Sequence, residues 1–126
     1  MEEQFIAHIS DSGKVQSVAE HSVTTAAAAA DFSIAELRQI NYLCGLLHDV
    51  GKYSSEFQRR IRGENIRVEH SICGALEAAK LEGKGTPLTL LLQLCIAGHH
   101  SGIPDCGVKN NTPDMPTLFG RLRRNP

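Results

Sequence analysis

The chain has 126 residues, of which 41% are hydrophobic and 21% charged, and its formal net charge is -1. This size and composition are typical of a single globular domain. The near-neutral charge excludes a generally basic surface, so any nucleic-acid contact needs a local basic patch. Neither a signal peptide nor an apolar stretch of membrane-spanning length is visible, so we expect a cytoplasmic protein with no membrane partner. The four cysteines form no C-x-x-C pair and are expected to be free thiols.

The N-terminal part is expected to be irregular up to residue 16. Within it, a turn is expected over residues 10–13, where Ser, Asp and Gly cluster. Ser17 is the expected N-cap of a first helix over residues 18–31. The run of alanines in that helix predicts close packing against a neighbouring helix.

A second helix is expected over residues 34–49, because its apolar side chains recur at three- and four-residue steps. Ser33 and Glu36 are spaced as a capping box at its start. This apolar, central helix ends in the motif His-Asp-Val-Gly-Lys at residues 48–52, where Gly51 permits a tight exit. An imidazole and a carboxylate therefore lie side by side at the end of a helix that we expect to be buried.

Four further helices are expected, over residues 54–62, 68–82, 88–100 and 117–124. Thr86 is the expected N-cap of the helix over 88–100, with Pro87 at the first helical position. That helix is apolar nearly all round, which predicts that it is buried, and a long loop follows it. No segment shows the two-residue period of a strand, so the sequence predicts an all-α fold.

Five of the six histidines fall inside or at the end of a predicted helix: His21, His48, His70, His99 and His100. A buried carboxylate beside a buried imidazole is costly unless it is compensated. A divalent cation that both groups ligate supplies that compensation. Together with Asp49, these imidazoles predict a site for one or two divalent metal ions between helix ends. Taken singly, His48 and Asp49 could instead be a hydrogen-bonded pair, and His21 or His70 a solvated residue.

Basic residues near this motif offer contacts for an anionic substrate. Lys52 lies one helical turn beyond His48, where its ammonium could hold a phosphate group or remain solvated at the helix end. The densest basic stretch before the C-terminal segment consists of Arg59, Arg60, Arg62 and Arg67. These arginines could follow a DNA backbone or form a solvated helix face. No aromatic platform accompanies them, because Phe57 fits the core equally well.

The order of the histidines and the aspartate along the chain resembles that of the HD superfamily of metal-dependent phosphohydrolases, which is all-helical. Within this superfamily, the motif at residues 48–52, followed by the stretch 54–58, is similar to the nuclease module of the CRISPR-associated type I nuclease–helicase. The Ala-His pair at residues 7–8, the stretch 97–105 and the segment 117–122 are also similar to that module. The resemblance spans nearly the whole chain.

The resemblance implies an HD-domain helical bundle that cuts single-stranded DNA, as an endo- and exonuclease, in the antiviral defence called type I CRISPR interference. It implies two partners, which are a helicase module in cis or in trans and an RNA-guided surveillance complex. It also implies two metal ions bridged by Asp49, drawn from Mn, Fe, Co or Ni with Mg as a further candidate. Because Lys52 could contact a substrate phosphate, we expect Asp49 and Lys52 to be the catalytic residues. One metal site would use His21, His48 and Asp49, and the other Asp49, His70, His99 and His100.

One ligand of the family pattern has no expected counterpart in this chain. The pattern ends in a further aspartate well downstream of the paired histidines, whereas Asp105 and Asp114 lie much closer to them. We therefore expect residues 1–126 to be an HD nuclease domain that is incomplete on its C-terminal side, either the N-terminal part of a longer protein or an unusually short module. The first metal site would then keep three protein ligands, and the second, with all four, would be occupied preferentially.

Two other functions are compatible with the same residues. An HD phosphohydrolase acting on nucleotides or cyclic dinucleotides would use the same ligands, because ligands specify the reaction and the pocket specifies the substrate. A polymer substrate predicts an open groove with basic walls, whereas a nucleotide predicts a closed pocket. The other alternative is a non-catalytic, metal-stabilised adaptor module.

Overall fold

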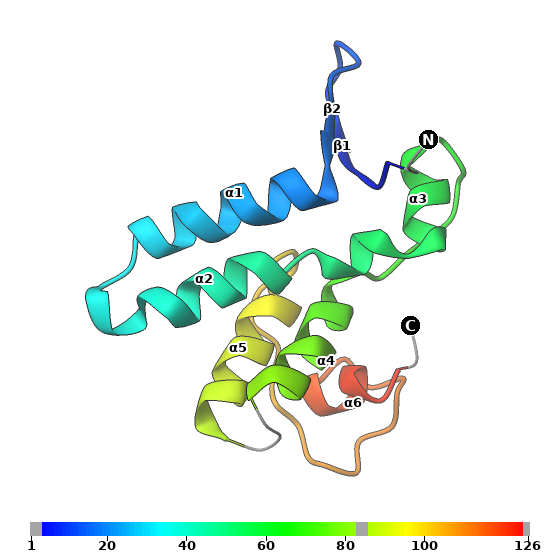
Figure 1. Cartoon of the computed structure of the whole chain (residues 1–126). Helices are drawn as coiled ribbons and strands as arrows, with labels where there is room; N and C mark the ends of the chain where they lie inside the picture. The colour runs from blue at the N-terminus through cyan, green and yellow to red at the C-terminus, as the bar shows by residue number, and fades with distance from the viewer. Residues whose placement is uncertain (1–3, 83–85, 125–126) are drawn as a thin grey trace.

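The chain folds mainly into helices, as the computed structural model in Figure 1 shows for residues 4–82 and 86–124. The α-helices are α1 (Val18–Asp31), α2 (Arg38–Leu47), α3 (Ser55–Ile61), α4 (Ser71–Glu82), α5 (Pro87–Ala97) and α6 (Leu118–Leu122). Two short 3-10 helices, η1 (Ala35–Leu37) and η2 (Val50–Tyr53), precede and follow α2. The prediction of an all-α fold is confirmed, with one small exception near the N-terminus. Among the described residues, no helix is both long and apolar enough to cross a membrane.

The exception is a β-hairpin in the segment that we expected to be irregular. β1 (Ile6–Ile9) pairs antiparallel with β2 (Val15–Ser17). The predicted turn joins the two strands: the amide of Gly13 donates to the carbonyl of Ser10 at 2.8 Å, and Gly13 has a φ of 85°. Strands of four and three residues are too short to show a two-residue period, which is why the prediction missed them.

α1 and α2 form an antiparallel pair (Figure 1). Ser17 caps α1 as predicted, since its side chain accepts a hydrogen bond from the amide of Glu20 at 3.1 Å. Small residues allow the two helices to approach each other closely: a Cβ on Gly45 would lie only 2.7 Å from the Cα of Ala26. The alanine run therefore serves close packing, as predicted.

The predicted start of α2 is wrong. The hydroxyl of Ser33 donates to the carbonyl of Ile34 at 2.9 Å and accepts from Nδ2 of Asn41 at 2.7 Å, so it caps no helix. The chain first forms η1, and α2 begins at Arg38. Ile34, which precedes η1, is 64% exposed. The apolar side chains of this part of the chain therefore reach the core only within α2.

α4 and α5 pack together beside the C-terminal end of α2 and surround the hydrophobic core. The buried members of this core are Leu47, Ile72, Ala75, Ala78, Leu92, Ile96, Ala97 and Leu118. Thr86 caps α5 through the amide of Thr89, and Pro87 is its first residue, as predicted. The expectation that this helix is buried is confirmed for the face that carries Leu92 and Ile96, whereas Leu91 is 50% exposed and Cys95 is also exposed.

Two helix boundaries differ from the prediction where histidines lie. α4 begins at Ser71 rather than at residue 68, and α5 ends at Ala97 rather than at residue 100. His70 therefore directly precedes α4, whereas His99 and His100 follow α5 in a turn. These three histidines lie on segments next to helix ends, and the packing of α4 against α5 holds those segments in place.

α6 follows the long loop predicted over residues 101–116, which the structure confirms. Thr117 caps α6 through the amide of Gly120 at 3.1 Å. The amide of Leu118 donates to the carbonyl of Asp105 at 2.8 Å, which ties the helix to its own loop. α6 inserts Leu118 into the core and buries most of the Arg121 side chain, which is 10% exposed.

Candidate metal centre

Asp49 follows the C-terminal end of α2 and is 2% exposed. Histidine side chains from four parts of the chain surround its carboxylate: α1, the end of α2, the residue before α4 and the turn after α5. Lys52 of η2 adds a fifth contact. The structure brings together all six side chains that were predicted as metal ligands, namely His21, His48, Asp49, His70, His99 and His100. The two oxygens of the carboxylate face different groups.

The Oδ2 atom of Asp49 faces His21, His48 and Lys52. Its distances are 2.9 Å to Nε2 of His21, 3.2 Å to Nε2 of His48 and 3.0 Å to Nζ of Lys52. The two imidazole nitrogens are 3.1 Å apart. His8, which was not among the predicted ligands, lies close to this group, because ligand atoms of His8, His21 and Asp49 all lie within 4.8 Å of one another.

The Oδ1 atom of Asp49 faces the other three histidines. It lies 3.1 Å from Nε2 of His70 and 3.1 Å from Nε2 of His99. Nε2 of His100 is 2.8 Å from Nε2 of His70. Ligand atoms of these four residues lie within 4.8 Å of one another, so this side of the carboxylate offers a set of four donors.

Hydrogen bonds fix which nitrogen of two histidines faces Asp49. The Nδ1–H group of His48 donates to the carbonyl of Gly45 at 2.6 Å, and that of His99 donates to the carbonyl of Ile96 at 2.7 Å. In each neutral ring the lone pair of Nε2 then points at a carboxylate oxygen, and two lone pairs repel each other unless a cation lies between them. A proton or a metal ion supplies that cation. Nitrogen and oxygen donors of this kind suit a borderline divalent metal, so the residues fit such an ion.

The charge state of the cluster also suits a cation. Burial alone would raise the pKa of Asp49, but the imidazoles of His48, His70 and His99 beside its oxygens hold that pKa far below its usual range, so the carboxylate is ionised. Burial lowers the pKa of His48, yet its hydrogen bonds to Asp49 and to a backbone carbonyl raise it overall. The Nδ1 atom of His70 is buried and has no hydrogen-bond partner among the described residues.

Comparison with known families identifies the fold. The family model of the HD domain matches residues 18–117, which include every side chain that contacts the Asp49 carboxylate. The chain belongs to the HD domain family. No curated protein and no solved structure matches it. HD domains are typically metal-dependent phosphohydrolases, and in this chain the histidine–aspartate cluster supplies the donors for a divalent metal.

Lys52 of the HD domain is buried, with 4% of its surface exposed. Its ammonium donates to Oδ2 of Asp49 at 3.0 Å and to the carbonyl of Ala7 at 3.3 Å, and it lies 3.5 Å from Nε2 of His8. The alternative of a solvated lysine at a helix end is therefore wrong. The ammonium balances part of the charge on Asp49 and ties the β-hairpin to the metal centre. A contact with a substrate phosphate stays a prediction.

Gly51 of the HD motif lies against the backbone of His70. A Cβ on Gly51 would be 2.2 Å from the carbonyl oxygen of His70, which is closer than any real contact. Its φ is not in the left-handed region, so the exit from α2 requires the absence of a side chain at Gly51 rather than a left-handed backbone. The glycine is needed because η2 packs directly on the segment that delivers His70 to the metal centre.

Arg121 is a largely buried residue of the site that the sequence analysis did not select. Its guanidinium donates to the carboxylate of Glu69 at 2.9 and 2.7 Å, to the carbonyl of Ala97 at 3.0 Å and to the hydroxyl of Ser71 at 3.0 Å. Glu69 directly precedes one histidine of the Oδ1 side, and Ala97 ends α5 just before the other two. One side chain therefore ties together both segments that carry these histidines. Arg121 lies three residues after Leu118, which is on the core face of α6. This spacing places both residues on the same face of the helix and could have indicated that Arg121 is buried.

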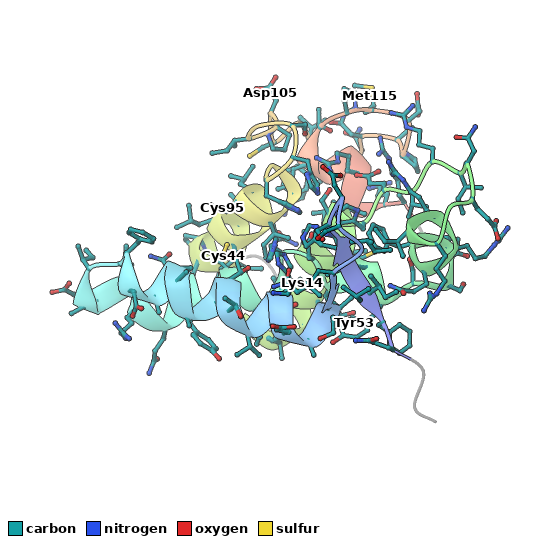
Figure 2. All side chains as sticks on the ribbon, turned by 90° about the horizontal axis from the view of Figure 1, so that it is seen from above. Lys14, Cys44, Tyr53, Cys95, Asp105 and Met115 are labelled. Atoms are coloured by element: carbon teal, nitrogen blue, oxygen red, sulfur yellow. The ribbon has the colours of Figure 1, made fainter. Side chains whose placement is uncertain are left out.

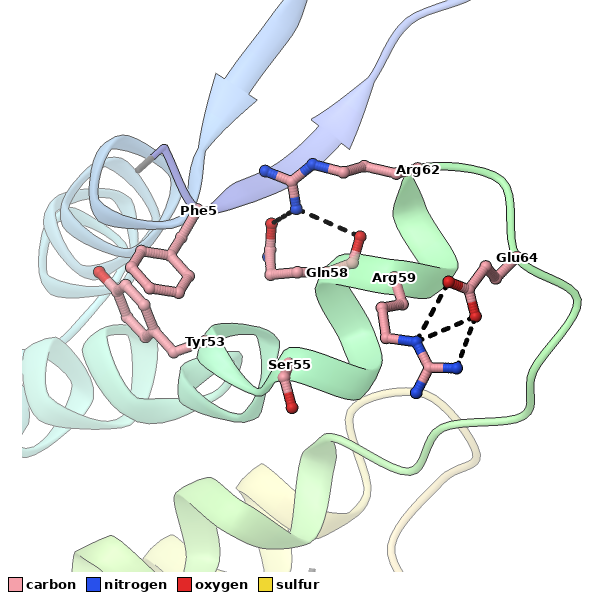
Figure 3. Close-up of a pocket in the computed structure, with 7 residues that line it drawn as sticks. All are labelled: Phe5, Tyr53, Ser55, Gln58, Arg59, Arg62 and Glu64. Carbon is pink, nitrogen blue, oxygen red and sulfur yellow. Dashed lines mark hydrogen bonds and ion pairs between the residues drawn. The ribbon is translucent and has the colours of Figure 1, made fainter. Parts of the chain in front are cut away.

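The four arginines predicted to contact DNA separate into two pairs. Arg60 and Arg67 line a groove of about 940 Å³ at the metal centre. Arg59 and Arg62 line a different hollow, which Figure 3 shows. The structure therefore places only the first pair beside the metal donors.

The two aspartates of the C-terminal loop are not part of the metal centre. Asp105 points outward from the loop (Figure 2), and Asp114 accepts a hydrogen bond from the hydroxyl of Thr112. Neither belongs to a cluster of candidate metal ligands among the described residues. This agrees with the expectation that neither one is the downstream aspartate of the family pattern.

Proposed function

We propose that this HD domain hydrolyses phosphodiester bonds of single-stranded DNA in a metal-dependent reaction. The observation that carries the proposal is the groove of about 940 Å³ at the metal centre. Two metal donors, His70 and His100, form part of its wall, together with Arg60, Arg67 and Arg124. A groove that combines metal donors with several guanidinium groups suits a chain of phosphodiesters, because each successive phosphate can meet a positive charge.

The arginines of the groove differ in their existing partners. Arg124 forms an ion pair with Glu69. Arg60 and Arg67 are exposed, and no ion pair of either residue occurs in the described part of the chain. Their guanidinium groups are therefore available to bind phosphate oxygens, which they can do in a bidentate manner.

The shape of this site favours a polymer over a nucleotide. Sites for small ligands enclose most of the ligand surface, whereas the groove at the metal centre is open to solvent. An open groove with basic walls is the feature that the sequence analysis associated with a polymer substrate. The alternative of nucleotide or cyclic-dinucleotide hydrolysis receives less support from this geometry.

Different residues have different roles in the proposed reaction. Divalent ions, when bound, would supply Lewis acidity at the phosphoryl group and activate water. One ion would be held by His21, His48 and Asp49, and the other by Asp49, His70, His99 and His100. The second set has four donors and would be occupied preferentially, with Mn, Fe, Co or Ni as the ions that the family resemblance implies. Arg60 and Arg67 would orient the strand along the groove, and Lys52, whose ammonium donates to Oδ2 of Asp49 at 3.0 Å, would hold that carboxylate in place.

The biological setting of this reaction is a further part of the proposal. The similarity of residues 48–58, 97–105 and 117–122 to the nuclease module of the type I nuclease–helicase supports a role in CRISPR interference. In that setting the domain would act in the cytoplasm, with a helicase module that feeds single-stranded DNA and an RNA-guided complex that recruits it.

The test is nuclease activity on circular single-stranded DNA with Mn, Ni or Mg, compared with the same protein in a chelator. We expect metal-dependent cutting that Asp49→Ala abolishes. Arg60→Ala should lower the affinity for DNA about tenfold, since it removes charge-assisted hydrogen bonds to phosphate. The matched control is Arg38→Ala on α2, because Arg38 is exposed and pairs with Asp31 away from the groove.

Absence of cutting by protein that demonstrably holds metal would contradict the nuclease proposal. Nucleotide hydrolysis by the same protein would then favour the small-substrate alternative. A metal-stabilised adaptor would instead show no hydrolysis of either substrate, and Asp49→Ala would lower its melting temperature together with its metal content.

A further inference from the structure

A second hollow, of about 450 Å³, lies between α3 and two exposed aromatic side chains (Figure 3). We name it the aromatic hollow, and the residues that define it are Phe5, Tyr53, Gln58, Arg59, Arg62 and Glu64. None of these residues lines the groove at the metal centre. The proposed hydrolysis therefore leaves the aromatic hollow without a role.

Two aromatic side chains of the hollow form an exposed pair. Phe5 and Tyr53 lie edge to face, with ring centroids 5.2 Å apart and an interplanar angle of 66°. The two residues are 36% and 41% exposed. Phe57, by contrast, is buried in the core, so the rings beside Arg59 and Arg62 are Phe5 and Tyr53. Exposed rings of this kind are surfaces on which unpaired nucleic-acid bases stack.

The backbone around Phe5 is fixed to α3. Gln58 accepts from the amide of Ile6 through Oε1 and donates to the carbonyl of Ile6 through Nε2, both at 2.9 Å. Nη2 of Arg62 donates to the carbonyl of Gln4 at 2.9 Å. A platform that is already rigid loses little conformational freedom when a ligand binds to it.

Tyr53 has a fixed position relative to the metal centre. It directly follows Lys52, whose ammonium lies 3.0 Å from Oδ2 of Asp49. Gln58 also donates to the carbonyl of Lys52 at 2.7 Å, so the same side chain holds both halves of the platform. Lys52 therefore connects the aromatic rings to the metal centre.

The arginines beside the rings can accept an anion. Arg59 pairs with Glu64 at 2.7 to 3.1 Å, and the two side chains are 59% and 50% exposed. Water and salt screen an ion pair as exposed as this one, so it contributes little. A phosphate oxygen can therefore replace the Glu64 carboxylate at the Arg59 guanidinium.

We propose that the aromatic hollow is a second binding site for single-stranded nucleic acid, in which a base stacks on Tyr53 and Phe5 and the adjoining phosphate pairs with Arg59. The inference rests on the proposed function, because it gives the same substrate strand a second contact outside the groove at the metal centre. The hollow binds the strand without cleaving it.

The fluorescence of Tyr53 tests this directly. The chain has no Trp and two Tyr, so Tyr42→Phe leaves Tyr53 as the only strongly emitting side chain. Titration of this variant with oligo(dT) of about ten nucleotides, in a chelator that prevents cleavage, should quench its emission with saturation. The matched control is Tyr53→Phe, in which Tyr42 on α2 is the remaining tyrosine and should show no saturable quenching.

Two substitutions change the affinity in opposite directions. Tyr53→Ala should weaken oligo(dT) binding about tenfold, which is within the range that one stacked base contributes. Glu64→Gln removes the competing carboxylate and should strengthen binding several-fold. Because it frees one positive charge, it should also steepen the logarithmic salt dependence of the affinity by about 0.7. This gain does not depend on whether Tyr53→Ala folds.

Unchanged Tyr53 emission at saturating oligo(dT), or no gain in affinity for Glu64→Gln, would overturn this proposal. Cutting of circular DNA distinguishes it from the proposed function. Metal-dependent cutting without Tyr53 quenching would overturn the aromatic hollow alone. Quenching without any cutting would overturn the nuclease assignment and leave the hollow as a binding site.

Discussion

The Nε2 atoms of His70 and His100 lie 2.8 Å apart, although thirty positions separate the two residues in the chain. Two imidazole nitrogens at this distance share a proton or a cation, and Oδ1 of Asp49 lies 3.1 Å from the same atom of His70. Both histidines lie just outside a helix, so their contact depends on how the ends of α4 and α5 are held. We therefore expect metal binding on the Oδ1 side of Asp49 to depend on the packing of these two helices.

The first prediction follows from this dependence. Ni²⁺ or Co²⁺ should raise the melting temperature, because an ion that binds only the folded chain stabilises it by about 2.7 kcal/mol at one hundred times its Kd. His100→Ala removes one of the four donors and should weaken metal affinity by at least about tenfold. Calorimetric titration and thermal melts measure both effects, with the exposed loop variant Asn110→Ala as control. Equal affinity of His100→Ala and the unmodified chain would contradict a four-donor site.

The gathering of these histidines around Asp49 could be predicted because several of them lie near a local helix signal. His21 lies in a helix that Ser17 caps, and His48 and Asp49 end an apolar helical stretch. The burial of Lys52 depends on the hairpin, because its ammonium donates to the carbonyl of Ala7, which lies 45 positions earlier in the chain. Contacts between such distant segments leave no periodic pattern in the sequence, so this part of the site could not be predicted.

The errors in the fold have similarly specific causes. Ser33 matches the spacing of a capping box, but its hydroxyl bonds to Asn41 and Ile34 instead. Side chains of this type compete with the backbone for hydrogen bonds, so the tertiary partners decide which bond forms. The hairpin was missed because tertiary contacts stabilise it: Gln58 of α3 bonds to both backbone groups of Ile6.

Gly51→Ala tests the packing of η2 on the segment before α4. The added Cβ would lie 2.2 Å from the carbonyl oxygen of His70, so the backbone of one segment must move. Overpacking of this kind costs about 1–3 kcal/mol, and the movement should also weaken metal binding. Urea denaturation and metal titration measure the two effects. If the variant unfolds at the same urea concentration and binds metal normally, the close contact does not set the position of His70.

The thiols predict a difference in chemical reactivity. All four cysteines are free, as expected, and Cys95 is exposed. Burial raises the pKa of Cys44 to about 11. Because the thiolate is the reactive form, iodoacetamide at pH 8 should label Cys95 first and Cys44 only after unfolding. Peptide mass spectrometry follows both sites, with urea-unfolded protein as the control. Equal labelling rates in the folded protein would contradict the packing of Cys44 against the core.

Arg121→Ala should both destabilise the fold and weaken metal binding on the Oδ1 side. It leaves the Glu69 carboxylate and the carbonyl of Ala97 without their donor, and losing charge-assisted hydrogen bonds of this kind costs about 2–3 kcal/mol. Arg121→Lys keeps the charge but not the fork of donors, so it should fall in between. Arg123→Ala, an exposed neighbour on the same turn, serves as control in urea denaturation and Co²⁺ titration. If Arg121→Ala bound Co²⁺ with unchanged affinity while folded, the histidines would keep their positions without the guanidinium, and its role would be stability alone.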